Sequence, residues 1–171
     1  LIALKKLDEL PNVSINRNYL DSDLAEVNKI KSELLEKLRG NKDIKPTFKK
    51  SVKKDSKAIG FADVEIPGLD KKYKAVSGDK NIDGFVNYTS KDDRLLKTFD
   101  RGKVNKAADV EAKILEKIYK QTTNNPNVKG KIRLFVDRKT CGSCQGVIRQ
   151  FAEMRPNIKL EIVMGPRPIK G

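Results

Sequence analysis

The chain has 171 residues, 37% hydrophobic and 35% charged, which suits one folded domain with a small appendage rather than two full cores. It has no histidine, no apolar run long enough to cross a membrane and only two cysteines, which excludes a Ser-His-Asp triad, a membrane partner and a disulfide scaffold. The net charge of +14 lies entirely beyond residue 44 and favours a polyanion such as nucleic acid as the partner.

The first predicted element is a helix over residues 21–39. Its apolar side chains recur at helical spacing, Asp21 or Ser22 can cap its start, and Gly40 ends it. Such a helix carries an apolar stripe that needs a partner. We therefore expect it to pack on the domain that follows or on a segment upstream.

Lysines crowd residues 41–57, and Pro46 lies among them. Because proline breaks a helix interior, this stretch is predicted to be a linker. The chain is accordingly divided into an N-terminal helical segment with the start of a linker, residues 1–44, and a second unit, residues 45–171. It begins with Leu1 and no leader follows, so we expect it to be a piece of a longer protein.

A hairpin comes next. Residues 58–66 alternate apolar and polar, Pro67 and Gly68 mark a turn, and residues 73–76 predict the return strand. Residues 77–106 lack strong periodicity. A crossing of this length is typically functional or disordered.

The remaining elements alternate between helix and strand. Periodicity predicts a helix over residues 107–121, a buried strand over 131–136, a helix over 141–154 and a strand over 158–164. Glycine and prolines from Gly165 onward predict a tail. A strand–helix–strand run with short connections favours parallel pairing, so the fold class is α/β.

Two cysteines open the last predicted helix. Cys141 and Cys144 have the spacing that binds one metal ion or forms one redox disulfide, and a helix N-terminus stabilises thiolates. A strand followed by this motif looks like thioredoxin, but too little chain follows Cys144 to complete that sheet. The two residues directly before Cys141 are Lys139 and Thr140, neither of which is aromatic. The thioredoxin-like thiol–disulfide protein is kept as an alternative.

A metal site needs a further ligand, and the chain offers no third cysteine and no histidine. A carboxylate must then complete it. Asp109 and Glu111 begin the preceding helix and are the candidates. Taken alone, the two acids would be ordinary helix N-terminal residues that favour the macrodipole.

Both motifs, in this order and at this separation, resemble the zinc-dependent nucleobase deaminases, which carry a His-x-Glu helix and a Pro-Cys-x-x-Cys helix. The chain is more similar still to the deaminase domains of bacterial polymorphic toxins, over about residues 58–164. This resemblance implies a cytidine deaminase-like three-layer fold with a mixed sheet, ordered hairpin, helix, strand, helix, strand, with the N-terminal helix added. The similar stretches are Ala62–Leu69, Asp83–Phe85, Asp109–Glu116, Asp137–Cys144 and Phe151–Ile158.

The resemblance also implies a chemistry. Asp109, Cys141 and Cys144 would bind Zn²⁺ together with a water molecule, and Glu111 would move protons between that water and the base. The reaction would convert cytosine to uracil in a nucleic acid, with DNA favoured over RNA. Adenine stays open as the base.

The chain departs from the family pattern at three positions. Asp109 stands where the family has histidine, Thr140 replaces the usual proline, and Val76 replaces the histidine of an Ala-His-Ser segment. Phe85, Tyr88 and Phe99 are candidates to stack on bases. The predicted substrate-binding residues are Ala75, Val76, Ser77, Phe85, Arg138 and Lys139. Of these, Arg138 and Lys139 lie just before the cysteines and are the candidates to bind phosphate.

The toxin resemblance carries expectations about context. The chain would be the toxic C-terminal domain of a secreted bacterial protein, delivered as a monomer into the cytoplasm of a target cell. A cognate immunity protein would block its site. A zinc-stapled nucleic-acid-binding module without catalysis is the second alternative.

Overall fold

One mixed sheet organises the computed structural model, which describes residues 10–98, 106–139 and 144–167. Within those residues the sheet has five strands in the order β1-β5-β4-β2-β3. β5 runs parallel to both β1 and β4, and β2 runs antiparallel to both β3 and β4. The strands are β1 (Val13–Asn16), β2 (Ile59–Glu65), β3 (Lys72–Val76), β4 (Gly130–Arg138) and β5 (Ile158–Arg167).

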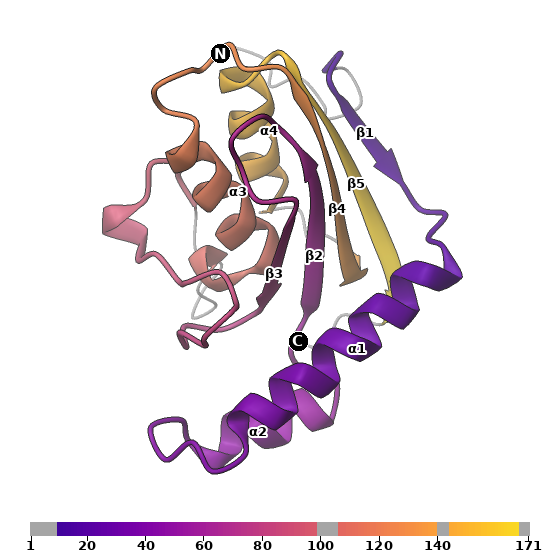
Figure 1. Ribbon diagram of the computed structural model, residues 1–171, viewed down its shortest axis with the longest axis vertical. Helices are drawn as coiled ribbons and strands as arrows, with labels where there is room; N and C mark the ends of the chain where they lie inside the picture. Colours follow the sequence, from indigo (N-terminus) through magenta and orange to yellow (C-terminus); the bar gives the residue numbers. More distant parts are fainter. Residues whose placement is uncertain (1–9, 99–105, 140–143, 168–171) are drawn as a thin grey trace.

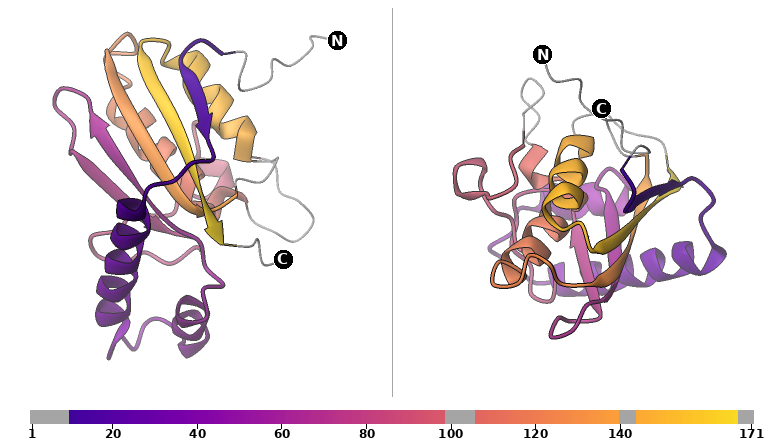
Figure 2. Two further views of the ribbon diagram at one scale, coloured as in Figure 1. Left: turned by 90° about the vertical axis from the view of Figure 1, so that its right-hand side faces the viewer. Right: turned by 90° about the horizontal axis from the view of Figure 1, so that it is seen from above.

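Helices cover both faces of this sheet (Figures 1 and 2). Phe61 of β2 packs in the cluster that holds α1 and α2, whereas its neighbour Ala62 packs in the cluster that holds α3 and α4. Successive side chains of a strand point to opposite faces, so the two clusters are the two interfaces of a three-layer α/β fold. The predicted fold class is thereby confirmed. The helices are α1 (Asp21–Leu38), α2 (Pro46–Lys53), α3 (Val110–Gln121) and α4 (Cys144–Met154).

The predicted hairpin, the helix before β4, the strand pair β4 and β5 and the helix between them all occur at the expected places. In the described part of the chain, no helix combines the length and the apolar character that crossing a membrane requires. The prediction of a linker over residues 41–57 is wrong, because α2 begins at Pro46. A proline in the first turn of a helix loses no intrahelical hydrogen bond, and its fixed φ suits that position.

The N-terminal segment contributes to the same sheet. β1 pairs with β5, and Arg133 of β4 donates two hydrogen bonds, of 2.6 and 2.8 Å, to the Asp23 carboxylate of α1. Asp23 also accepts the Leu20 N–H, so neither predicted cap begins α1. Burial alone would raise the pKa of Asp23, but the bonds from Arg133 and Leu20 outweigh it and lower that pKa. The division at residue 44 stays a prediction.

β5 continues to Arg167, so a tail that begins at Gly165 is wrong. A register shift in β4 between Val136 and Arg138 lies opposite this end of β5, and the backbones approach closely there. A Cβ at Gly165 would lie 2.6 Å from the Asp137 carbonyl oxygen. Only glycine fits this contact without a backbone shift.

Gly165→Ala is therefore expected to lower the free energy of unfolding by about 1–3 kcal/mol, since overpacking forces the backbones apart. Gly146→Ala in α4 is the matched control, because no atom lies within 4 Å of the added Cβ. It should leave stability unchanged or raise it by up to about 1 kcal/mol. Urea denaturation measures both, and equal stability of the Gly165→Ala chain and the wild type would contradict the pairing described.

Candidate active site

The N-terminal ends of α3 and α4 come together at one end of the sheet. α3 leads into the start of β4 and α4 leaves its end, so both helices run antiparallel to β4. They pack against each other on one face of the sheet (Figure 1). The first turns of both helices consequently lie where β4 ends.

Asp109 and Glu111 occupy the start of α3. Asp109 is its N-cap residue, with a side chain 23% exposed and a carboxylate oxygen 3.7 Å from Lys106 Nζ. Glu111 lies in the first turn and is only 4% exposed. Carboxyl groups are almost never buried this fully unless they are paired, and Glu111 does take part in an interaction within the structure.

The predicted metal ligands are only partly covered by the structure. Cys144 begins α4, but its side chain and the whole of Cys141 lie outside the described residues. Within the described residues, no three His, Cys, Asp or Glu side chains gather closely enough to hold a metal ion. The set of Asp109, Cys141 and Cys144 therefore stays a prediction.

The end of β3 is fixed against the start of α3. Ser77 donates its N–H to the Ala58 carbonyl at 2.9 Å and accepts the Ala58 N–H on its hydroxyl, also at 2.9 Å. Gly78 donates its N–H to the Ala108 carbonyl at 3.0 Å, directly before Asp109. These bonds place the backbone of residues 77–78, here called the Ser77 segment, beside the first turn of α3.

Of the three predicted substrate-binding residues at this end of β3, two have side chains in the core. Ala75 is 0% exposed and packs in the cluster of α3 and α4, whereas Val76 is 1% exposed and packs on the side of α1 and α2. Ser77 is half-buried. Only the backbone of Ala75 and Val76 is thus available to shape a neighbouring site.

Lys113 was not anticipated from the sequence. It is 2% exposed, and its ammonium group donates a hydrogen bond of 2.7 Å to the Val76 carbonyl. Burial lowers the pKa of Lys113 to about 8, although the carboxylate of Asp79 partly offsets this effect. Lys113 is one of many lysines in the chain, and only the tertiary contacts distinguish it.

This lowered pKa makes stability depend on pH. The folded chain releases the Lys113 proton near pH 8, whereas an unfolded lysine keeps it up to about pH 10.5, so the unfolded state binds more protons between these values. The free energy of unfolding of the wild type should rise by about 3 kcal/mol over that range, relative to Lys113→Met. Urea denaturation from pH 7 to 10.5 measures this difference. Lys117→Met, at an exposed position of α3, is the control and should show the same pH dependence of the free energy of unfolding as the wild type. If Lys113→Met also shows the wild-type pH dependence, the prediction is contradicted.

The two predicted phosphate-binding residues differ in placement. Arg138 is 7% exposed; its Nε donates to the Asp137 carboxylate and its Nη2 donates to the carbonyls of Asp55 and Lys57. Its guanidinium therefore joins the end of β4 to the segment after α2. Lys139 is exposed.

The candidate stacking aromatics also differ. Phe85 is 7% exposed and packs in the cluster of α1 and α2, with Lys74 Nζ 5.1 Å from its ring centroid. Tyr88 is half-buried, and Phe99 lies outside the described residues. Phe85 is thus held by packing and by a cation–π contact.

A buried ion pair fixes to α3 the segment of residues 94–96, here called the crossing segment. Glu116 is 1% exposed and accepts the N–H groups of Leu95 and Leu96 at 3.0 and 2.9 Å. Arg94, 2% exposed, has Nη2 at 3.5 Å from the same carboxylate and donates to the Ala112 carbonyl at 3.0 Å. The segment that leads toward α3 is thereby anchored on the helix that carries Glu111.

Comparison with known proteins gives one family. A sequence model of the Toxin-deaminase family, described as the BURPS668_1122 family of deaminases, matches residues 41–165. The match spans α2 to most of β5 and includes both motifs at the helix starts. A search of curated proteins found no match.

Proposed function

The chain belongs to the Toxin-deaminase family, and from this premise we propose that it hydrolyses the amino group of cytosine in a nucleic acid, giving uracil and ammonia. The observation that carries the proposal is the buried Glu111 in the first turn of α3, a helix that packs against α4. Family membership makes the chain a deaminase toxin domain. The base and the polymer belong to the proposal.

The donor set favours zinc. Asp109, Cys141 and Cys144 would supply one carboxylate and two thiolates, which suit Zn²⁺, and the fold brings the starts of α3 and α4 to the same end of the sheet. Bound zinc lowers the pKa of a water molecule to near neutrality. These three residues would therefore hold the metal.

Glu111 would do the proton transfers. Its carboxylate takes a proton from the attacking water as the oxygen adds to C4 of cytosine and gives it to the ring nitrogen N3; it then takes the proton of the new C4 hydroxyl and gives it to the amino group, which leaves as ammonia. Burial at 4% exposure keeps bulk water away from this group, so its proton is delivered to the base. The Ser77 segment, held by Ala58 and Ala108, would form the wall next to the base.

The charge of the chain supports a polymer as substrate. The surplus of basic side chains favours a nucleic acid over free cytidine, since release of counterions drives binding to phosphates. DNA is favoured, with RNA as the other polymer and adenine as the other base. The proposal includes secretion by a bacterium, delivery as a monomer into a target cell, and a cognate immunity protein that blocks the site.

The test incubates the zinc-loaded chain with single-stranded DNA, double-stranded DNA and RNA, and sequences the products. We expect cytosine-to-uracil conversion in DNA and about one zinc per chain by elemental analysis. Zinc-loaded protein that converts no base in any of these polymers would overturn the proposal. Reversible oxidation of Cys141 and Cys144 with no bound metal would support the thiol–disulfide alternative instead.

A further inference from the structure

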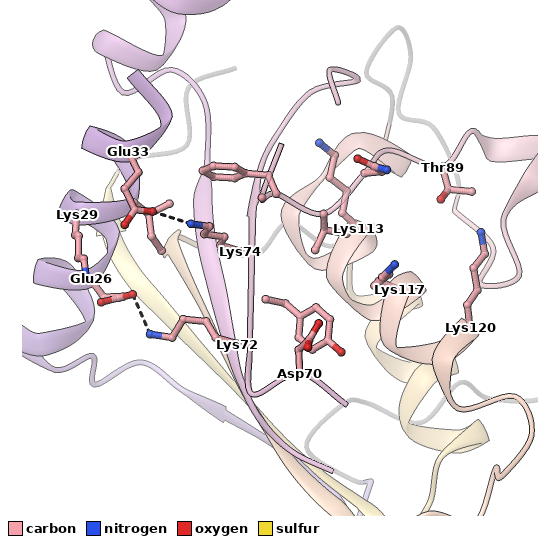
Figure 3. A pocket seen from close by; sticks show the side chains of 16 residues that line it. Glu26, Lys29, Glu33, Asp70, Lys72, Lys74, Thr89, Lys113, Lys117 and Lys120 are labelled. Atoms are coloured by element: carbon pink, nitrogen blue, oxygen red, sulfur yellow. Dashed lines mark hydrogen bonds and ion pairs between the residues drawn. The ribbon is translucent and has the colours of Figure 1, made fainter. Parts of the chain in front are cut away.

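A pocket of about 640 Å³ opens between α1, β3 and α3 (Figure 3). α1 and α3 form its two walls, and β3 lies between them together with the segment of residues 84–89, whose Val86 N–H binds the Lys74 carbonyl. It adjoins the candidate active site, because Val76, whose carbonyl Lys113 binds, is followed by the Ser77 segment beside the start of α3. Six lysines line it: Lys29 from α1, Lys72 and Lys74 from β3, and Lys113, Lys117 and Lys120 from α3.

The carboxylates of the pocket neutralise only part of this charge. Lys72 Nζ lies 2.9 Å from Glu26, and Lys74 Nζ lies 2.7 Å from Glu33, both across the gap between β3 and α1. The remaining carboxylate among the lining residues is that of Asp70. Six lysines against three carboxylates leave the pocket with a positive surplus.

The surplus is carried by exposed lysines on opposite walls. Lys29 and Lys117 are exposed, and within the described part of the chain neither makes a hydrogen bond or ion pair through its ammonium group. Lys120 is also exposed, 3.6 Å from a Glu116 carboxylate that Leu95 and Leu96 already share. Lys113, Lys117 and Lys120 are spaced by about one helical turn each, so they follow one side of α3. Figure 3 shows the three side chains along α3, on the far side of β3 from α1.

We propose that Lys29, Lys117 and Lys120, here called the lysine groove, bind the sugar-phosphate backbone of the substrate strand next to the nucleotide that reacts. The inference rests on the proposed function. Lysine ammonium groups act as point charges that attract phosphates without reading sequence, and charges on two opposing walls fit an extended polyanion that passes between them. A strand with its reacting base at Glu111 would leave the site past the Ser77 segment and enter this groove.

The experiment compares two triple variants that remove the same charge. Lys29→Gln, Lys117→Gln and Lys120→Gln remove the lysine groove. Lys42→Gln, Lys45→Gln and Lys50→Gln remove three exposed lysines around α2 as the matched control. Both are made with Glu111→Gln, so that binding is measured without turnover. The probe is a fluorescein-labelled single-stranded oligodeoxynucleotide, followed by anisotropy between 50 and 200 mM salt.

The groove variant should bind about ten-fold or more weakly than its parent at 100 mM salt, and the control variant less than about three-fold more weakly. The slope of log K against log salt should fall by about 2 in the groove variant, since each lost phosphate contact on a single strand removes roughly 0.7. Equal weakening in both variants would overturn the groove, because net charge alone would then explain it. Unchanged binding by the groove variant would overturn it too.

Deamination by chains that keep Glu111 separates this inference from the proposed function. With the groove lysines replaced, KM for the oligonucleotide should rise while kcat stays within about two-fold of the wild type. Conversion with an unchanged KM would contradict substrate binding at the lysine groove and would leave the proposed function unaffected. If the wild-type chain neither binds nor converts any polynucleotide but binds an acidic protein, both proposals fail and the groove is a protein-docking surface.

Discussion

Glu111→Gln is expected to slow deamination by about 10²- to 10⁴-fold, the range that a positioned general acid–base group contributes. Glutamine keeps the shape of the buried side chain, which is 4% exposed in the wild type, but it cannot carry a proton. The folded structure should therefore persist while the proton transfers fail. The measurement is kcat for cytosine conversion in an oligonucleotide, together with the thermal unfolding temperature.

The control is Glu153→Gln, which removes an exposed carboxylate from α4 and should leave kcat unchanged. Zinc content and oligonucleotide affinity of the Glu111→Gln chain should stay at wild-type values, because the residue is proposed to move protons and not to bind metal. A Glu111→Gln chain with the wild-type rate would remove Glu111 from the mechanism. Loss of zinc from it would instead make Glu111 a ligand, contrary to the proposed role.

Glu116→Ala should have the largest effect on stability, lowering the free energy of unfolding by about 3–5 kcal/mol. It leaves the Arg94 guanidinium buried at 2% exposure without its carboxylate, and it leaves the N–H groups of Leu95 and Leu96 without their acceptor. Uncompensated buried charge and unsatisfied donors both carry a large desolvation cost. Urea denaturation of the wild type and the variant measures the difference.

Two further variants separate charge from hydrogen bonding. Glu116→Gln keeps one acceptor and should cost less than Glu116→Ala. The double variant Arg94→Leu with Glu116→Leu removes both charges, so it should be more stable than the Glu116→Ala chain, because replacing a whole buried pair by apolar groups costs less than leaving half of it. If Glu116→Ala lowers stability by less than about 1 kcal/mol, the crossing segment is not held by this pair.

Sequence and structure each contribute a different part of the candidate active site. The order of the two motifs and their helix–strand context already indicate Asp109, Glu111, Cys141 and Cys144, and the family match agrees with the deaminase interpretation. The structure adds that Glu111 is buried and that α3 and α4 start at the same end of the sheet. Both additions depend on packing between elements, which a periodic pattern does not describe.

Several contacts that shape the site could not be anticipated. Arg138 stays a predicted phosphate-binding residue, and the structure adds that its Nε donates to Asp137 and its Nη2 donates to the carbonyls of Asp55 and Lys57. Lys113 looks like its neighbours in the sequence, yet it is buried against Val76. The side chains alone are identical in type to exposed ones, and partners more than 30 residues away along the chain, Val76 for Lys113 and Asp55 for Arg138, set them apart.

The sequence by itself determined the elements that local chemistry specifies. The hairpin over β2 and β3, the amphipathic helices α1, α3 and α4, and the strands β4 and β5 follow from side-chain periodicity and turn residues, which act over a few neighbouring positions. Tertiary structure decided the rest. β1 is four residues long and is stabilised by pairing with β5, and β5 reaches Arg167 because Gly165 lets two backbones approach. Such contacts join residues that are distant along the chain, so no local pattern encodes them.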